Sequence, residues 1–349
     1  MQPPRGDLVD VGRASMILVA ADAGPRETLS PLQEPLGTTL ANMSSPQAAT
    51  DAHWRGLIRR SGARGVVCGT SDSTAGRNAE AGARRAAAAE GVPVAAIEDF
   101  PGNYCDVPGG AVTLLFVESD GVAALTRAKW RDACPPLVVL SPARYDPERR
   151  AAAALRARAR ERWRAANAPR AILWAGQPET ADCLHTLSVL LPVLEKHGIA
   201  LLFKAHPRDS GYPESYRTLL AASRVQWQDL TGMLVPDALA LAPQLVLTQF
   251  SSVAVESGFH GIPSLHVLLP DAGGARLLEK TGYRIPPYCE AGAAAFVTGA
   301  EAFEGELLEV IGSTARRESI VNCFDVYFST GAATLPALVA RLKSIGAAG

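Results

Sequence analysis

Several motifs of well-known enzyme classes are absent from this sequence. Its 349 residues contain no G-x-G-x-x-G, no G-x-x-x-x-G-K-S/T, no H-E-x-x-H and no D-x-D. These absences argue against a standard dinucleotide fingerprint, a P-loop and a zincin site. The six cysteines are scattered and form no C-x-x-C pair. That pattern is typical of reduced, mostly buried thiols in a cytoplasmic protein.

Charge of one sign and long apolar runs are also lacking. The formal net charge is -1, without a basic block or a Lys/Arg-rich tail, which argues against nucleic-acid binding. The longest apolar stretch, around residues 187–194, contains Pro192 and is too short to span a bilayer. Residues 1–6 lack the charged start and apolar core of a signal peptide. We therefore expect a cytoplasmic protein without a nucleic-acid partner; peripheral membrane association stays open.

The sequence does contain a regular alternation of predicted strands and helices. An apolar content of 48% can fill two cores. Short apolar runs predict buried strands at 16–21, 65–69, 92–97, 113–117 and 136–140, and then at 171–175, 199–203, 225–228, 244–248 and 264–268. Helices are predicted at 74–90, 121–133, 179–196, 212–221, 233–241, from 252 onward, 301–311 and 334–345. This rhythm predicts an α/β protein with two Rossmann-like parallel-sheet domains facing a cleft.

A charged, Ala-rich segment separates the two halves. Residues 146–165 are strong helix formers, with Pro147 at a suitable first helical position. Asn167-Ala-Pro169 then breaks the helix. We therefore expect an N-terminal Rossmann-like domain at 1–145, a linker helix at 146–169 and a C-terminal Rossmann-like domain at 170–349.

A cationic cluster follows the apolar run 199–203. It consists of Lys204, His206 and Arg208. Alternate residues of an extended chain share a face, so these three side chains are expected to point the same way. Open parallel sheets bind ligands beyond the carboxyl ends of their strands. The cluster therefore predicts a phosphate site, and its alternative is a surface loop with ordinary charges.

Two serines and a glutamate follow the run 244–248. Ser251 is a candidate N-cap, which would leave the first-turn N–H groups and the Ser252 hydroxyl for an anion. Glu256 lies one turn deeper on the same helix face, where it could accept hydrogen bonds from ribose or sugar hydroxyls. The alternative is a simple helix cap. A serine nucleophile is disfavoured, because no G-x-S-x-G frames either serine.

Other polar residues follow other predicted strands. Gln177 and Gln249 are candidate ligand contacts, and Gln177 could equally shape a turn. In the first half a general base would come from Asp72, Glu98 or Asp99, although each could serve a turn or a cap instead. Without paired acids to hold Mg²⁺, a phosphate leaving group would depend on protein cations and helix dipoles, so no metal site is expected.

The second half resembles the donor-binding domain of GT-B-fold glycosyltransferases. The resemblance rests on Gln177-Pro178, on Lys204-Ala-His-Pro-Arg208 and on Ser251-Ser-Val-Ala-Val-Glu256. It is strongest toward bacterial enzymes that use CMP-activated sugars, of the sialyltransferase and Kdo-transferase types. Glycerol-phosphate polymerases and UDP-N-acetylglucosamine 2-epimerases share parts of the layout. The similarity covers 171 to about 269, and residues 248–252 lack the glycine-rich turn of the epimerase pattern.

The resemblance implies a role for each matching residue. His206, Ser251 and Ser252 would contact the phosphate of the donor, and Glu256 the ribose. In our own interpretation, beyond the resemblance, 1–145 is the acceptor-side domain and 170–349 the nucleotide-sugar-binding domain. Lys204 or Arg208 would neutralise charge on the leaving group, and Asp72 or Asp99 would deprotonate the acceptor if the reaction inverts.

The expected function is therefore a metal-independent glycosyltransferase in bacterial surface-glycan or glycoconjugate synthesis. Its co-substrate would be a CMP- or UDP-linked sugar, without a further cofactor, and its acceptor a glycan, a lipid-linked molecule or a protein. The alternatives are a sugar-nucleotide epimerase or hydrolase on the same fold, and a non-catalytic nucleotide- or glycan-binding protein. The oligomeric state stays open, since the sequence shows no heptad or extended apolar stripe.

Overall fold

The chain folds into two compact α/β units. The structure, a computed structural model, describes residues 16–41, 50–164, 170–328 and 333–348. One unit comprises Met1–Asp146 with Ala333–Gly349, and the other comprises Pro147–Ala332. Each unit contains one parallel sheet with helices on its faces, which confirms the predicted fold class. No helix among the described residues is long and apolar enough to cross a membrane.

The first unit is built on a five-stranded sheet whose strands lie in sequence order. Neighbouring strands are all parallel. The first four are completely buried, as expected for a parallel sheet that is covered on both sides. The strands are β1 (Ile17–Val19), β2 (Val66–Cys68), β3 (Val94–Ile97), β4 (Leu114–Val117) and β5 (Leu137–Val139).

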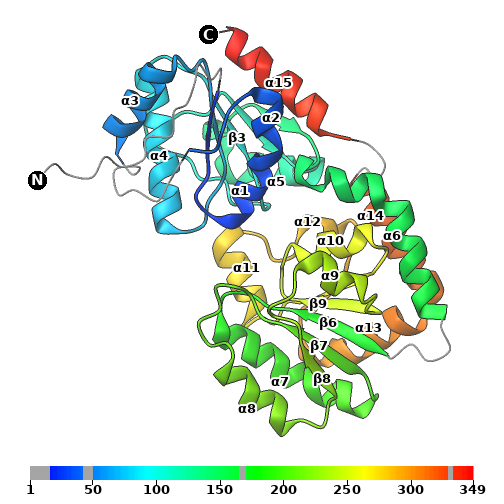
Figure 1. Cartoon of the computed structure of the whole chain (residues 1–349). Helices are drawn as coiled ribbons and strands as arrows, with labels where there is room; N and C mark the ends of the chain where they lie inside the picture. The colour runs from blue at the N-terminus through cyan, green and yellow to red at the C-terminus, as the bar shows by residue number, and fades with distance from the viewer. Residues whose placement is uncertain (1–15, 42–49, 165–169, 329–332, 349) are drawn as a thin grey trace, which may run out of the picture. The chain divides into compact units, whose positions relative to one another are not determined.

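Different segments of the chain cover the two faces of this sheet. Right-handed crossovers between sequential parallel strands place one helix of each of the first, second and fourth connections on the same face. That face packs against α3 (Asp51–Ser61), α4 (Thr74–Ala89) and α5 (Asp120–Trp130). The opposite face is covered by α1 (Ala23–Leu29), α2 (Gln33–Leu36) and α15 (Leu335–Ala348), which lie side by side in Figure 1. Short 3-10 turns occupy Ser30–Leu32, Arg131–Ala133 and Ala143–Tyr145.

The C-terminal helix α15 belongs to the first unit. Leu338 and Leu342 are buried against the first sheet. The carboxylate of Asp146 accepts hydrogen bonds from the N–H groups of Thr334 and Leu335 and so fastens the start of the helix. The expected boundaries, with 170–349 as one domain, therefore differ from the observed division. An apolar helix face shows that the helix packs on a sheet but does not show on which one. The predicted helix break at 167–169 lies outside the described residues.

The second unit contains a six-stranded parallel sheet with the order β11-β10-β9-β6-β7-β8. Its central strands β6, β9 and β10 are completely buried. The strands are β6 (Ala171–Ala175), β7 (Ala200–Lys204), β8 (Trp227–Asp229), β9 (Leu245–Thr248), β10 (Ser264–Val267) and β11 (Ala295–Val297).

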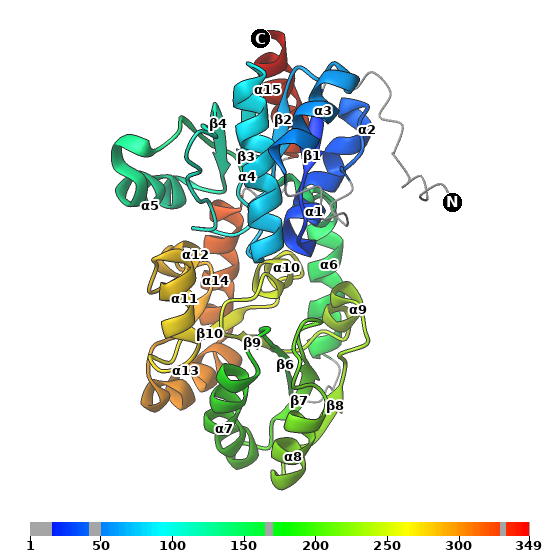
Figure 2. The ribbon, with the colours of Figure 1, turned by 90° about the vertical axis from the view of Figure 1, so that its left-hand side faces the viewer.

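Helices cover both faces of the second sheet as well. Helices α7 (Thr180–Lys196), α8 (Glu214–Ala222) and α13 (Ala300–Gly312) contribute to the large core on one face. Helices α9 (Val235–Ala240) and α10 (Val253–Phe259) lie on the other face, as Figures 1 and 2 show. The remaining helices are α6 (Asp146–Arg164), α11 (Gly273–Thr281), α12 (Pro287–Glu290) and α14 (Thr314–Tyr327).

Candidate functional site

The strand order of the second sheet reverses between β6 and β9. From β6 the chain moves outward through β7 and β8, and it then returns to β9 on the other side of β6 before reaching β10 and β11. The two loops that leave β6 and β9 therefore separate, and ligands of doubly wound sheets bind at such a switch point. Gln177 and Ser251 follow these two strands. The structure thus brings the predicted segments after β6 and β9 to one edge of one sheet.

The loop that follows β9 is held rigidly. The Thr248 hydroxyl donates to the carbonyl oxygen of Ala175 at 2.7 Å and accepts the N–H of Ser251 at 3.2 Å. Gln249 is buried, and its amide nitrogen donates to the Thr186 hydroxyl at 2.8 Å. Gln249 was predicted to contact ligand, but these bonds give it a positioning role beneath the loop.

The two serines lie at the start of α10 and are half-buried. The cap residue is Ser252, one position later than predicted, and its side chain makes no capping hydrogen bond. The Ser251 hydroxyl accepts the N–H of Val253 at 3.4 Å. Glu256 is also half-buried. Burial lowers the pKa of Lys204, and the charge of the nearby Glu256 opposes this shift. The pair of hydroxyls and Glu256 therefore belong to the same edge of the sheet.

Lys204 holds a loop. Its buried ammonium group donates to the carbonyl oxygens of Leu230 and Thr231 at 3.5 and 3.2 Å and also to that of Met233. An ammonium group has three hydrogens, so these carbonyls can take all of them. This geometry fits a residue that fastens the loop after β8 better than one that contacts a ligand.

His206 and Arg208 do not continue the strand. The N–H of Asp209 donates to the carbonyl oxygen of His206 at 2.9 Å, so the chain turns at Pro207 and Arg208. The expectation that Lys204, His206 and Arg208 share one face of an extended chain is therefore wrong beyond His206. Arg208 is exposed, whereas His206 is half-buried.

The protonation of His206 follows from its contacts. Its Nδ1 atom accepts the N–H of Arg208 at 3.0 Å. Burial and then the Arg208 charge lower the pKa of His206 to about 4, so the ring is neutral at pH 7. A neutral imidazole that accepts at Nδ1 carries its proton on Nε2. His206 is therefore a fixed N–H donor beside the switch point.

The segment after β6 contributes two more polar groups. Gln177 is buried, and the nitrogen of its side-chain amide has no hydrogen-bond partner in the described part of the chain. Glu179 pairs with Lys280 of α11 at 2.8 Å. The sequence offered no signal for Lys280, because α11 follows a later strand and is joined to the site only by the fold.

The carboxyl edge of the first sheet carries the acidic residues that were predicted as bases. The Asp72 carboxylate pairs with Arg77 at 2.6 Å. Asp99 is half-buried, accepts the Thr70 hydroxyl at 2.6 Å and the Asn103 amide at 3.3 Å, and has a pKa raised by burial. The Asp72 carboxylate is therefore engaged in an ion pair with α4, and the Asp99 carboxylate in hydrogen bonds to neighbouring side chains.

Glu98 has the most unusual environment of these acids. Its Oε1 atom accepts the N–H groups of Gly102 and Tyr104 at 2.9 and 3.0 Å. Its Oε2 atom is buried without a hydrogen-bond partner among the described residues. Burial raises its pKa to about 8, so the side chain is largely protonated at neutral pH. A buried acid with one unpartnered oxygen and a shifted pKa is a candidate proton donor or acceptor.

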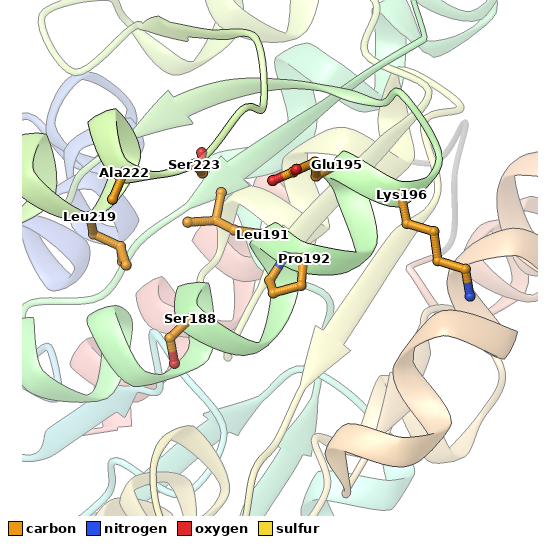
Figure 3. A pocket seen from close by; sticks show the side chains of 8 residues that line it. All are labelled: Ser188, Leu191, Pro192, Glu195, Lys196, Leu219, Ala222 and Ser223. Atoms are coloured by element: carbon orange, nitrogen blue, oxygen red, sulfur yellow. The ribbon is translucent and has the colours of Figure 1, made fainter.

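The described residues offer neither a metal centre nor a second ligand site at this edge. Among the described residues, no group of three or more His, Cys, Asp or Glu side chains could hold a metal ion. A surface hollow of about 510 Å³ lies between α7 and α8 and is shown in Figure 3. The α7 residues that line it fall between Ser188 and Lys196, in the second half of the helix. This half leads to the amino end of the next strand, β7. Ligands of parallel sheets bind at the opposite edge.

Comparisons with known proteins agree with this architecture. No family model and no curated protein sequence matches the chain. Among solved structures, a UDP-GlcNAc 2-epimerase from Neisseria meningitidis bound to UDP-GlcNAc has a TM-score of 0.60 at 14% identity, over 91% of this chain and 89% of that one. The epimerase from Methanocaldococcus jannaschii gives 0.54 at 14% identity, over 94% and 99%. The wall teichoic acid polymerase TagF gives 0.51 at 12% identity, over 96% and 90%. The chain therefore has the GT-B-type fold of these structures, which confirms the predicted fold.

Proposed function

We propose that the protein is a glycosyltransferase that moves a sugar from a nucleotide-activated donor to an acceptor hydroxyl in bacterial surface-glycan or glycoconjugate synthesis. The observation that carries this proposal is the neutral His206, whose Nε2–H is fixed as a donor beside the switch point of the second sheet. The half-buried Ser251 and Ser252 lie at the same edge. Such an edge suits the phosphate of a nucleotide.

The chemistry would break the bond between the anomeric carbon of the sugar and a phosphate oxygen of the donor. The bonding electron pair leaves with the phosphate, which gains negative charge. His206 would donate its Nε2–H to that oxygen, and Arg208 would add positive charge from the adjacent turn. Preorganised donors aimed at developing charge contribute about 10²- to 10³-fold each to a rate. These protein groups would stabilise the charge on the leaving phosphate without a bound metal ion.

The acceptor hydroxyl must lose a proton as it attacks. Asp72 and Asp99 were the predicted bases, and Glu98 fits the role better. A carboxylate whose pKa is raised to about 8 holds a proton much more strongly than an ordinary carboxylate and is matched to neutral pH. We therefore assign the proton transfer to Glu98 within this proposal.

A sugar-nucleotide epimerase or hydrolase is the second candidate. The similarity to UDP-GlcNAc 2-epimerase structures favours it, and a protonated Glu98 could equally serve such a reaction. The absence of glycine between Thr248 and Ser252 argues against it. Both candidates place the nucleotide at the edge formed by β6, β7 and β9.

Product analysis separates these functions. The purified protein is incubated with UDP-GlcNAc and with CMP-linked sugars, with and without glycan acceptors, and the nucleotide and sugar products are identified. We expect nucleotide release that depends on an acceptor, together with a new glycosidic bond. Release without an acceptor, or an altered sugar, supports the epimerase or hydrolase. Absence of any product from a folded sample that binds the nucleotide would leave a non-catalytic binding protein.

A further inference from the structure

An ion pair joins α7 to α11 at the carboxyl edge of the second sheet. Glu179 is the residue that precedes the first turn of α7, and Lys280 lies in the last turn of α11. The Lys280 Nζ atom lies 2.8 Å from Oε1 of Glu179, and the two side chains are only 23% and 22% exposed. Both groups are thus largely withdrawn from solvent.

Three observations place this ion pair at the candidate phosphate site. The Lys280 Nζ atom lies 5.9 Å from the centre of the ring of Phe250, which is the residue directly before Ser251 in the sequence. Glu179 and Lys280 are both close enough to His206 to act on its charge state. The start of α11 packs tightly on the loop after β9, because a Cβ atom at Gly273 would lie 2.7 Å from Cγ of Gln249.

The ion pair is incompletely satisfied. Oε2 of Glu179 is buried without a hydrogen-bond partner in the part of the chain that the structure describes. By contrast, Arg156 binds both oxygens of Asp325, at 2.5 and 2.7 Å. A buried carboxylate oxygen without a partner loses its hydration and gains nothing in return. If another anion replaces Glu179 beside Lys280, the free-energy cost is therefore lower than for a carboxylate whose two oxygens both accept hydrogen bonds.

Lys204, which lies at the same edge of the sheet, already has hydrogen-bond partners. The Lys204 ammonium group is held by the carbonyl oxygens of Leu230, Thr231 and Met233. Lys280 instead has an anion as its partner, and a phosphate can take the place of an anion. Glu179 would repel the same phosphate as long as it remained beside Lys280.

We propose that Lys280 binds the phosphate of the nucleotide donor and that Glu179 is its resident counter-ion, which gives up Lys280 when the phosphate arrives. This inference rests on the proposed function, because it assumes a nucleotide at the switch point. It adds an exchange of ion-pair partners to that site. The lysine is kept in place before binding, and the site carries less net positive charge while it is empty.

The two members of the pair should then have opposite effects on binding. Lys280→Met removes a charge that contacts the phosphate and weakens nucleotide binding, by roughly 10-fold or more for a lost charge-assisted contact. Glu179→Gln removes a competing anion and leaves nucleotide binding as tight as in the wild type or tighter. A salt bridge that only holds α11 against α7 predicts weaker binding in both variants.

The test is calorimetric titration of the full-length wild type and both variants with UDP, CDP and CMP. Asp182→Asn and Lys196→Met supply the controls, because Asp182 pairs with Arg276 between the same two helices at 3.3 Å and Lys196 pairs with Glu304 at the far end of α7. These controls should bind like the wild type. Melting temperatures confirm that each variant is folded.

Weaker binding by the Lys280 variant, together with binding by the Glu179 variant that is at least as tight as in the wild type, supports the inference. Equal losses of nucleotide affinity in both variants, or no change in either, overturn the inference. The proposed function still stands in that case if the wild type binds a nucleotide. A wild type that binds none of the three nucleotides overturns both proposals.

Discussion

Replacement of His206 by alanine is expected to lower kcat by about 10²- to 10³-fold, the range measured for the loss of one preorganised donor to developing charge. The ring is neutral at pH 7, and its Nε2–H is available because Nδ1 accepts the N–H of Arg208. Alanine removes the only group through which this residue can contact the leaving phosphate. Steady-state kinetics with the donor identified by product analysis measure the effect.

The fold should survive this substitution. Arg208 is exposed, so its N–H can bond to water once the imidazole is gone, and the loss of one such hydrogen bond costs about 1 kcal/mol. His197→Ala is the matched control, because His197 pairs with Glu304 beyond the far end of α7. An unchanged kcat in the His206 variant, or an equal loss in the His197 variant, would remove His206 from the mechanism.

Glu98→Gln should lower kcat/KM by about 10²- to 10⁴-fold, the contribution typical of a positioned acid or base. Burial raises the pKa of Glu98 to about 8. As a base, Glu98 must be ionised, so the wild-type rate should rise with pH through this value and level off above it. Glutamine cannot ionise, so the remaining rate should lose that rise. A pH profile of kcat/KM in both proteins measures the change.

The same variant tests whether Glu98 is instead a structural residue. At neutral pH Glu98 is mostly protonated, so glutamine copies its charge and size and should preserve the melting temperature. Glu80→Gln is the control, since burial also raises the pKa of Glu80 to about 7 but both of its oxygens accept hydrogen bonds from Ser71. If the Glu80 variant loses the alkaline rise and the Glu98 variant keeps it, the assignment to Glu98 is wrong.

The sequence predicts most of the sheet architecture because buried parallel strands are short, continuous apolar runs. The segments 171–175 and 244–248 correspond to β6 and β9 to within a residue. Strand β11 was not predicted, because Ala295-Phe-Val297 is too short to stand out from its Ala-rich surroundings. The helices that were also not predicted are α1, α2, α3, α11, α12 and α14. Their positions depend on which surfaces the sheets leave open.

The chemistry of the edge was less accessible to sequence reasoning. His206, Ser251 and Ser252 were predicted as site residues because they closely follow apolar runs; these roles stay predictions. The carbonyl contacts of Lys204 could not be foreseen, since they come from a loop 26 to 29 residues further along the chain. Lys280 lies 101 residues from Glu179 and shares no local pattern with it. Tertiary contacts of this kind leave no periodic trace in the sequence.

The central claim is that the carboxyl edge of β6, β7 and β9 binds the phosphate of a nucleotide. The most direct test is a calorimetric comparison of UDP, CDP and CMP with the matching nucleosides, which lack phosphate, using the wild-type protein. We expect saturable binding of at least one nucleotide, at one site per chain, and no measurable binding of its nucleoside. A nucleoside that binds as tightly as its nucleotide, or a folded sample that binds none of them, would contradict the account.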